Sequence, residues 1–237
     1  MEFEFPVKRV FFDSGMVLVH PRTGHWFATE TFKSACAALG ASWEEVLAGP
    51  TAEVARVYLD ENHLIRTEDE ELALFSDYYR ILLAPFAPFA PDELEAVVER
   101  CALAKVKDYA KYAFYADVGE AVPRLAARFP LGIISDAWPS VLSVYEAAGL
   151  RRWFDPFVVS SIHGSVKAEG TLFEIALSGV AEAPEECLFV DDSPKNCELA
   201  AYYGLNPVLF LRGSPAPNRS SQFPQARSLA ELEKLLG

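Results

Sequence analysis

The chain is short of basic residues, because 21 lysines and arginines stand against 34 aspartates and glutamates and leave a formal net charge of -13 at pH 7. An acidic surface of this size repels phosphate backbones, and no local basic patch interrupts it. We therefore expect no nucleic-acid partner. Long apolar runs are missing as well, since none approaches the roughly 18 residues that a membrane-spanning helix needs. We expect no membrane partner either.

Cysteine is also scarce, with four among 237 residues and no CxxC pair. All four cysteines lie within apolar patterns, which is typical of reduced thiols in a core. The N-terminal Met-Glu-Phe-Glu-Phe carries acids where a secretory signal carries lysine or arginine. Because 51% of the residues are hydrophobic, the chain can bury a sizeable core. We predict a cytoplasmic globular protein, monomer or dimer, that acts on a small molecule.

Helical patterns dominate residues 22–111. Three segments place a capping residue three positions before a glutamate, which predicts the start of a helix at each. These segments are Ser42 to Glu45, Thr67 to Glu70 and Asp92 to Glu95. An earlier helix is expected over residues 26–39, with Gly40 as its C-terminal cap. Proline at every third position of residues 84–91 favours a stiff polyproline connector.

Strands and helices alternate in the rest of the chain. Val10–Phe12 is a short apolar run that Asp13 ends, as expected of a buried strand. Further strands are predicted at 131–134, 157–160, 187–190 and 207–211, and helices at 118–129 (capped by Asp117), 139–148, 171–177, 194–203 and from Ser228 onward. Residues 212–227 are expected to be a surface loop. This alternation predicts an α/β fold with a parallel sheet covered on both faces, interrupted after its first strand by a helical module.

Polar residues follow the predicted strands. In an open parallel sheet, ligands bind beyond the carboxyl ends of the strands. The residues at these ends are Asp13, Ser135, Asp136, Lys167, Asp191, Asp192 and Asn196. Carboxylates packed together repel one another and are tolerated chiefly beside a cation. Oxygen ligands without histidine or cysteine favour Mg²⁺, and Lys167 beside a metal suits an anionic substrate such as a phosphate.

Four segments resemble, in order, the motifs of the haloacid dehalogenase-like (HAD) superfamily. They are residues 10–18, 132–135, 167–169 and 188–196. The helical module lies where subfamily I of that superfamily has its cap, and the resemblance covers nearly the whole chain. It implies a Rossmann-like three-layer core of residues 1–21 and 112–237 with an all-helical cap of residues 22–111. Such a cap closes over the strand ends, and Arg22, His25 and Trp26 lie at its entry.

The resemblance implies a role for each matched residue. Asp13 is the nucleophile that forms an aspartyl-phosphate, and its reference pKa near 3.9 leaves it ionised at pH 7. Ser135, Lys167 and the backbone N–H of Asp136 bind the phosphoryl oxygens. The catalytic set is therefore Asp13, Ser135 and Lys167, and the substrate-binding set is Ser14, Gly15, Ser135, Asp136 and Lys167. The Mg²⁺ ligands are Asp13, the Gly15 carbonyl, Asp192 and Asp191, and Asn196 braces the last loop.

One position departs from the resemblance. HAD phosphatases usually carry a second aspartate two residues after the nucleophile, and this chain has Gly15 there. A positioned acid or base contributes about 10² to 10⁴ in rate. Its absence implies a slow enzyme, a substrate with a good leaving group such as a sugar-1-phosphate or an acyl phosphate, or a substituted acid. Candidate substitutes by sequence are Ser14, His20, His25 and His163.

Three functions stay open at this stage. The first is a Mg²⁺-dependent phosphatase of a small phosphorylated metabolite. The second is a 2-haloacid dehalogenase, which would use Asp13 without a metal and would tolerate Gly15, but would leave the later acid pair without a cation. The third is a catalytically weak HAD-like binding module.

Overall fold

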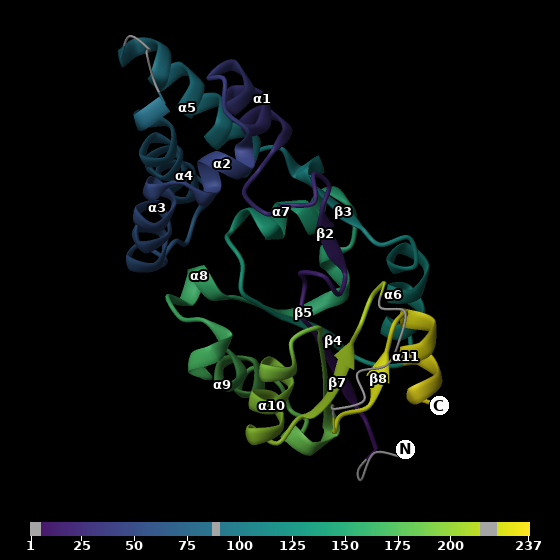
Figure 1. Cartoon of the computed structure of the whole chain (residues 1–237). Coiled ribbons are helices and arrows are strands. Elements are labelled where there is room, and N and C mark those ends of the chain that lie inside the picture. The colour runs from purple at the N-terminus through teal and green to yellow at the C-terminus, as the bar shows by residue number, and fades with distance from the viewer. Residues whose placement is uncertain (1–5, 87–90, 214–221) are drawn as a thin grey trace. The chain divides into compact units, whose positions relative to one another are not determined.

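The computed structural model describes residues 6–86, 91–213 and 222–237, and the chain divides into two compact units. One unit comprises residues 1–20, 114–137 and 145–237, and the other residues 21–113 and 138–144 (Figure 1). The short segment 138–144 groups with the helical unit although it lies far along the sequence. The domain division expected from the sequence assigns residues 138–144 to the α/β core instead. That division stays a prediction.

The first unit is built on a six-stranded sheet of order β5-β4-β1-β6-β7-β8. Its strands are β1 (Arg9–Phe12), β4 (Leu131–Ser135), β5 (Phe154–Val159), β6 (Cys187–Asp191), β7 (Asn206–Phe210) and β8 (Gln225–Ala226). Neighbouring strands pair in parallel, and β1 lies between β4 and β6, with Phe11 in register with Gly132 and Phe189. A side chain at Gly132 would collide with the Phe11 ring, since a Cβ there would lie 2.6 Å from it.

Helices cover both faces of this sheet, which confirms the predicted α/β, Rossmann-like core. They are α6 (Val118–Ala126), α9 (Thr171–Ser178), α10 (Pro194–Tyr202) and α11 (Leu229–Leu235), and a short helix, α8 (Ser160–His163), follows β5. Figure 1 shows α9 and α10 beside one face and α6 with α11 beside the other. On the first face, Phe173 of α9 and Ala200 of α10 pack with Phe11 and Phe189 in one apolar cluster. Burial of such side chains drives the layered packing.

The second unit is helical. It contains α1 (Glu30–Ala38), α2 (Trp43–Ala48), α3 (Pro50–Glu61), α4 (Glu68–Leu83), the 3₁₀ turn η1 (Ala84–Phe86), α5 (Pro91–Val106) and the first part of α7 (Ser140–Ala147). Phe32, Phe75, Tyr79 and Cys101 are buried in its core. The capping boxes at Ser42 and Thr67 are present, because each side chain accepts a backbone N–H and the glutamate three residues on reciprocates.

Several local predictions were wrong. Helix α1 begins at Glu30 rather than near residue 26, because Thr29 accepts the Phe32 N–H and caps it there. Asp92 lies inside α5 rather than capping it, and Glu95 pairs with Arg80 instead. The loop predicted over 212–227 contains β8. Of the predicted polyproline connector, residues 87–90 lie outside the described residues, and residues 84–86 form η1.

The expected cap of α6 was also wrong. Asp117 makes no side-chain capping bond to α6. Its carboxylate accepts the Leu229 N–H at 2.9 Å and pairs with Arg212. Strands β2 (Val19–Pro21) and β3 (Tyr112–Phe114) form a separate two-stranded sheet. The chain passes from one unit to the other within each of these strands, after residue 20 and after residue 113. Within the described ranges, no helix combines the length and apolar character needed to cross a membrane.

Candidate active site

Three strands of the sheet deliver the predicted site residues to one edge. Asp13 directly follows β1, Ser135 ends β4 and Asp191 ends β6. The Asp13 N–H donates to the Val190 carbonyl at 2.8 Å, so the pairing between β1 and β6 continues to the carboxylate itself. Because these strands are parallel neighbours, side chains far apart in sequence meet at their carboxyl ends.

Lys167 lies between two of these carboxylates. Its Nζ is 2.9 Å from Asp13 Oδ1 and 2.7 Å from Asp191 Oδ2, and the residue is 2% exposed. Burial by itself would lower the pKa of Lys167, but the negative charges of Asp13 and Asp191 outweigh burial and raise it. The ammonium is therefore held in its charged form at the centre of the site.

Asp191 is held from the start of α10. Asn196 Nδ2 lies 3.1 Å from each of its carboxylate oxygens, and the Ser193 N–H donates to Oδ1 at 2.8 Å. Ser193 itself caps α10. Asp191 is fully buried, so these donors and Lys167 replace the water that a carboxylate would otherwise bind. This is the bracing expected of Asn196.

Three carboxylates converge around the single lysine. Oxygen atoms of Asp13, Asp191 and Asp192 lie within 4.8 Å of one another, and Asp192 is the most exposed of the three. Burial raises the pKa of Asp13 to about 7, Lys167 opposes that rise, and the Asp191 charge adds to it. The pKa of Asp13 thus departs from the ordinary value expected from the sequence, chiefly because the residue is buried, and the excess of negative charge over one ammonium adds to the rise. An all-oxygen donor set with this excess fits a hard divalent cation.

A family model for haloacid dehalogenase-like hydrolases matches residues 7–204 of the chain. The chain belongs to this family.

Solved structures share its fold. They include a HAD phosphatase from Thermococcus onnurineus (19% identity, TM-score 0.61, covering 98% of this chain and 98% of that one) and a 2-haloacid dehalogenase from Pseudomonas syringae pv. Tomato (19%, 0.64, 97% and 98%). A third is YfnB from Bacillus subtilis, described as a HAD-hydrolase and bound to magnesium (16%, 0.64, 98% and 100%). No curated protein matches the chain. At these identities the likeness shows the fold, and it includes both phosphatase and dehalogenase structures.

In this HAD-like hydrolase, the turn that follows Asp13 folds back on itself. The N–H groups of Leu18 and Val19 both donate to the Ser14 carbonyl, at 2.9 and 3.0 Å. Ser14 Oγ lies 2.9 Å from the hydroxyl of Tyr145, and both side chains are buried. The Ser14 hydroxyl therefore has a partner in the core, and its contact with a substrate stays a prediction. Gly15 lies within the same turn, and its carbonyl stays a predicted metal ligand.

The histidines named as substitute acids occupy different places in the fold. The His20 ring lies 4.8 Å from that of Tyr115, and the His25 ring lies 5.2 Å from that of Trp43 in the helical unit. His163 ends α8. Their candidacy as the missing acid stays a prediction.

The loop after β4 has two anchors on the segment that follows β5. Asp136 Oδ1 accepts the Lys167 N–H at 2.9 Å. One residue further on, the Ala137 N–H donates to Ser160 Oγ at 3.0 Å. Ser160 was not among the predicted site residues. The sequence feature that could have pointed to it is the pair Ser160 and Ser161 at the end of a predicted strand.

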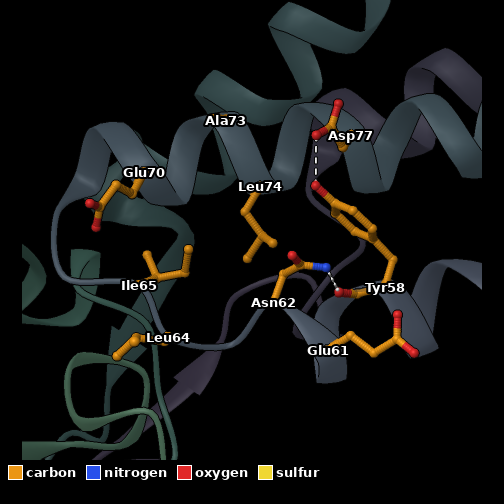
Figure 2. A pocket seen from close by; sticks show the side chains of 9 residues that line it. All are labelled: Tyr58, Glu61, Asn62, Leu64, Ile65, Glu70, Ala73, Leu74 and Asp77. Carbon is orange, nitrogen blue, oxygen red and sulfur yellow. Dashed lines mark hydrogen bonds between the residues drawn. The ribbon is translucent and has the colours of Figure 1, made fainter.

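A hollow of about 410 Å³ lies in the helical unit between α3 and α4. Figure 2 shows its walls, with Tyr58 reaching from α3 to Asp77 of α4. The Tyr58 hydroxyl donates to Asp77 at 2.6 Å, and Glu70 accepts the Arg66 N–H at 2.7 Å as part of its helix cap. These polar contacts join or cap the helices around the hollow, so they serve the packing of the helical unit.

Proposed function

We propose that this HAD-like hydrolase is a Mg²⁺-dependent phosphatase of a small phosphorylated metabolite, with Asp13 as its nucleophile. One observation supports the proposal above all: three carboxylates crowd within 4.8 Å of one another around one buried lysine. Additional positive charge would stabilise such a cluster in its ionised form. The four buried, free cysteines support a reducing, cytoplasmic location. Monomer and dimer are both compatible with the proposal.

Mg²⁺ would be held by Asp13, Asp191, Asp192 and the Gly15 carbonyl. When bound, the ion neutralises charge on the carboxylates and on the phosphoryl oxygens. Lys167 already contacts Asp13 and Asp191, so the same side chain would orient the nucleophile and neutralise an incoming phosphate. Because two carboxylates already hold the Lys167 ammonium in place, its charge is preorganised. Preorganised charge is the largest single contribution to the rate enhancement of many enzymes.

The chain's own residues would perform the chemistry in two steps. A carboxylate oxygen of Asp13 bonds to phosphorus while the bond from phosphorus to the leaving oxygen breaks, and the leaving group departs with that electron pair. Ser135 and the Asp136 N–H hold the phosphoryl oxygens during this transfer. Water then attacks the aspartyl-phosphate, which restores Asp13 and releases inorganic phosphate. Because Gly15 cannot donate a proton, we propose substrates with good leaving groups, such as a sugar-1-phosphate or an acyl phosphate.

A 2-haloacid dehalogenase is the second candidate, supported by Gly15 and by the likeness to dehalogenase structures. The acid cluster favours the phosphatase, since in a metal-free reaction the single ammonium of Lys167 would face three carboxylates.

The test compares p-nitrophenyl phosphate with 2-chloropropionate, each with Mg²⁺ and with EDTA. We expect slow, Mg²⁺-dependent nitrophenol release that falls by about 10³-fold or more in Asp13→Asn. Asp60→Asn, which changes an exposed acid of α3, should match the wild type. Halide release that ignores EDTA would replace the phosphatase with the dehalogenase. No turnover of either substrate would favour the weak binding module.

A further inference from the structure

A single hydroxyl holds both polar backbone groups of Ala137. Ser160 Oγ accepts the Ala137 N–H at 3.0 Å and donates to the Ala137 carbonyl at 3.2 Å. Ser160 is 7% exposed and is the first residue of α8, directly after β5. Buried backbone groups without a partner are costly. This hydroxyl therefore helps to fix a residue that lies outside any strand or helix.

The held residue lies two positions after Ser135. The loop of residues 135–137 contains the Ser135 hydroxyl and the Asp136 N–H, the groups proposed above to hold a phosphoryl group. Asp136 is anchored in its turn, because its Oδ1 accepts the Lys167 N–H at 2.9 Å. Residues 160–167 thus hydrogen-bond to two consecutive residues of the loop, to the side chain of Asp136 and to the backbone of Ala137.

The same segment also places the ammonium. The backbone of Lys167 holds Asp136, while its Nζ bridges Asp13 and Asp191. A displacement of the loop relative to this segment would therefore change the spacing between the Ser135 hydroxyl and the nucleophile. In general, misplacing a reacting group by about 1 Å costs about 10²-fold in rate.

We propose that Ser160 is a positioning residue, which keeps the loop of residues 135–137 in register with Lys167 and Asp13. The inference rests on the proposed function for its kinetic consequence. Alanine at position 160 has no hydroxyl, so the Ala137 N–H loses its partner and the Ala137 carbonyl loses one of its two donors, whereas threonine keeps the hydroxyl. The Ser161 N–H also donates to the Ala137 carbonyl, at 3.3 Å, but this contact comes from the backbone and survives any change of side chain.

Ser161 provides the matched control. It is 2% exposed, adjacent in sequence and on the same short helix, yet its hydroxyl has no hydrogen-bond partner among the described residues. Removing that hydroxyl leaves no backbone group without a partner. Ser161→Ala therefore deletes the same atom as Ser160→Ala from an equally buried site, without loosening the loop.

The first measurement is steady-state kinetics with p-nitrophenyl phosphate and Mg²⁺. We expect kcat to fall about 10-fold in Ser160→Ala with a smaller change in KM, because the loop is misplaced rather than lost. Ser160→Thr should recover most of kcat, and Ser161→Ala should match the wild type. A Ser160→Ala enzyme with a lower Tm but an unchanged kcat would reduce Ser160 to a structural residue and overturn the inference.

The second measurement needs no activity. Hydrogen exchange at the Ala137 amide should accelerate at least 10-fold in Ser160→Ala and stay unchanged in Ser161→Ala. Unchanged exchange in Ser160→Ala would overturn the inference whether or not the enzyme turns over. If the wild type releases halide instead of nitrophenol, the proposed function has failed separately. The same kinetic comparison on the haloacid then decides the role of Ser160.

Discussion

Each unit of the molecule buries a cluster of charged side chains, and the two clusters are built differently. In the α/β unit, Lys167 contacts the carboxylates of Asp13 and Asp191, with Asp192 beside them. In the helical unit the balance is reversed, because Glu71 lies among Lys105 and Lys111. The members of this second cluster are at most 8% exposed, with Glu71 at 0%.

The charged side chains of the helical cluster find their hydrogen-bond partners within the chain itself. Glu71 accepts the Ser140 N–H at 2.7 Å and the Ser140 hydroxyl at 2.8 Å. Lys111 donates to the same hydroxyl at 2.9 Å and to the carbonyls of Lys105 and Val106. These contacts use the donors of Lys111 and both oxygens of Glu71.

Aromatic side chains complete the closure. Lys105 Nζ donates to the Tyr112 hydroxyl at 2.9 Å and lies 5.0 Å from the centre of the Phe75 ring and 5.4 Å from that of Phe27. Ring faces stabilise an ammonium that water cannot reach. The surplus positive charge of this cluster is therefore offset by carbonyls and rings. In the acidic cluster, Lys167 is the one cation that pairs with any of the three carboxylates among the described residues, although Asn196 and the Ser193 N–H also hydrogen-bond to Asp191. Buried charge alone therefore does not mark a site, because the charged side chains of the helical cluster are satisfied within their own unit.

Removing the lysine from the acidic cluster should give the largest effect. In Lys167→Met, two buried carboxylates lose their counter-charge, so we expect a loss of about 3–5 kcal/mol in the free energy of unfolding at pH 8 with EDTA present. Urea unfolding measures this loss. The surface variant Lys107→Met, which removes the ion pairs of an exposed lysine with Glu68 and Asp69, should change stability by less than about 1 kcal/mol. Equal stability of both variants would mean that Lys167 does not offset the buried carboxylates of the acidic cluster.

Added Mg²⁺ should stabilise the acidic cluster by nearly as much. A ligand that binds only the folded state at 100 times its Kd contributes about 2.7 kcal/mol. We expect the Tm to rise with Mg²⁺ in the wild type and in Glu71→Gln, and to rise little in Asp192→Asn. Differential scanning calorimetry across a Mg²⁺ titration tests this. A rise that Asp192→Asn preserves would place the ion elsewhere.

Glu71→Gln should have an intermediate effect, confined to the helical unit. Glutamine keeps one acceptor for Ser140 but loses the charge that faces Lys111, so we expect a loss of about 2 kcal/mol in the free energy of unfolding. Because this cluster is closed, kcat of the folded enzyme should not change. Chemical unfolding and kinetics on the same preparation separate the two quantities, and a fall in kcat without a loss of stability would link Glu71 to catalysis.

The acidic cluster could be predicted from the sequence and the helical one could not. Asp13, Ser135 and Asp191 each follow an apolar run, and the rule that parallel strands meet at their carboxyl ends brings them together without any further information. Helix starts at Ser42 and Thr67 were equally accessible, because a capping box is a contact over three residues.

Contacts with distant or backbone partners leave no such pattern. Glu71 and Ser140 are 69 positions apart, and Asp117 and Leu229 are 112 apart. Before folding, nothing distinguishes Asp117 as an anchor for α11 from Asp117 as a cap for α6. Ser160 was hidden for another reason, since it binds the backbone of Ala137, and any residue except proline at position 137 would offer the same two groups.

The smallest effect is expected at Lys105, and it depends on pH. Burial lowers the pKa of Lys105 to about 8, with Glu71 opposing that shift. Between this value and the ordinary 10.5, the unfolded chain binds a proton that the folded chain does not, so this lysine makes stability rise with pH over that range. In Lys105→Met the cost of the buried charge disappears. We therefore expect the variant to gain about 1 kcal/mol below pH 8 relative to the wild type.

That gain should shrink toward pH 10, where the wild-type lysine is itself neutral in the folded state. Taking the difference between variant and wild type at each pH cancels the titration of the tyrosines and cysteines that both proteins share. Urea unfolding at pH 7, 8, 9 and 10 provides the curve, with Lys107→Met as a surface control that should show no such trend. If Lys105→Met instead unfolds more readily at pH 7 and loses activity, the lysine contributes a needed charge, and the helical cluster would have to be treated as a site like the acidic one.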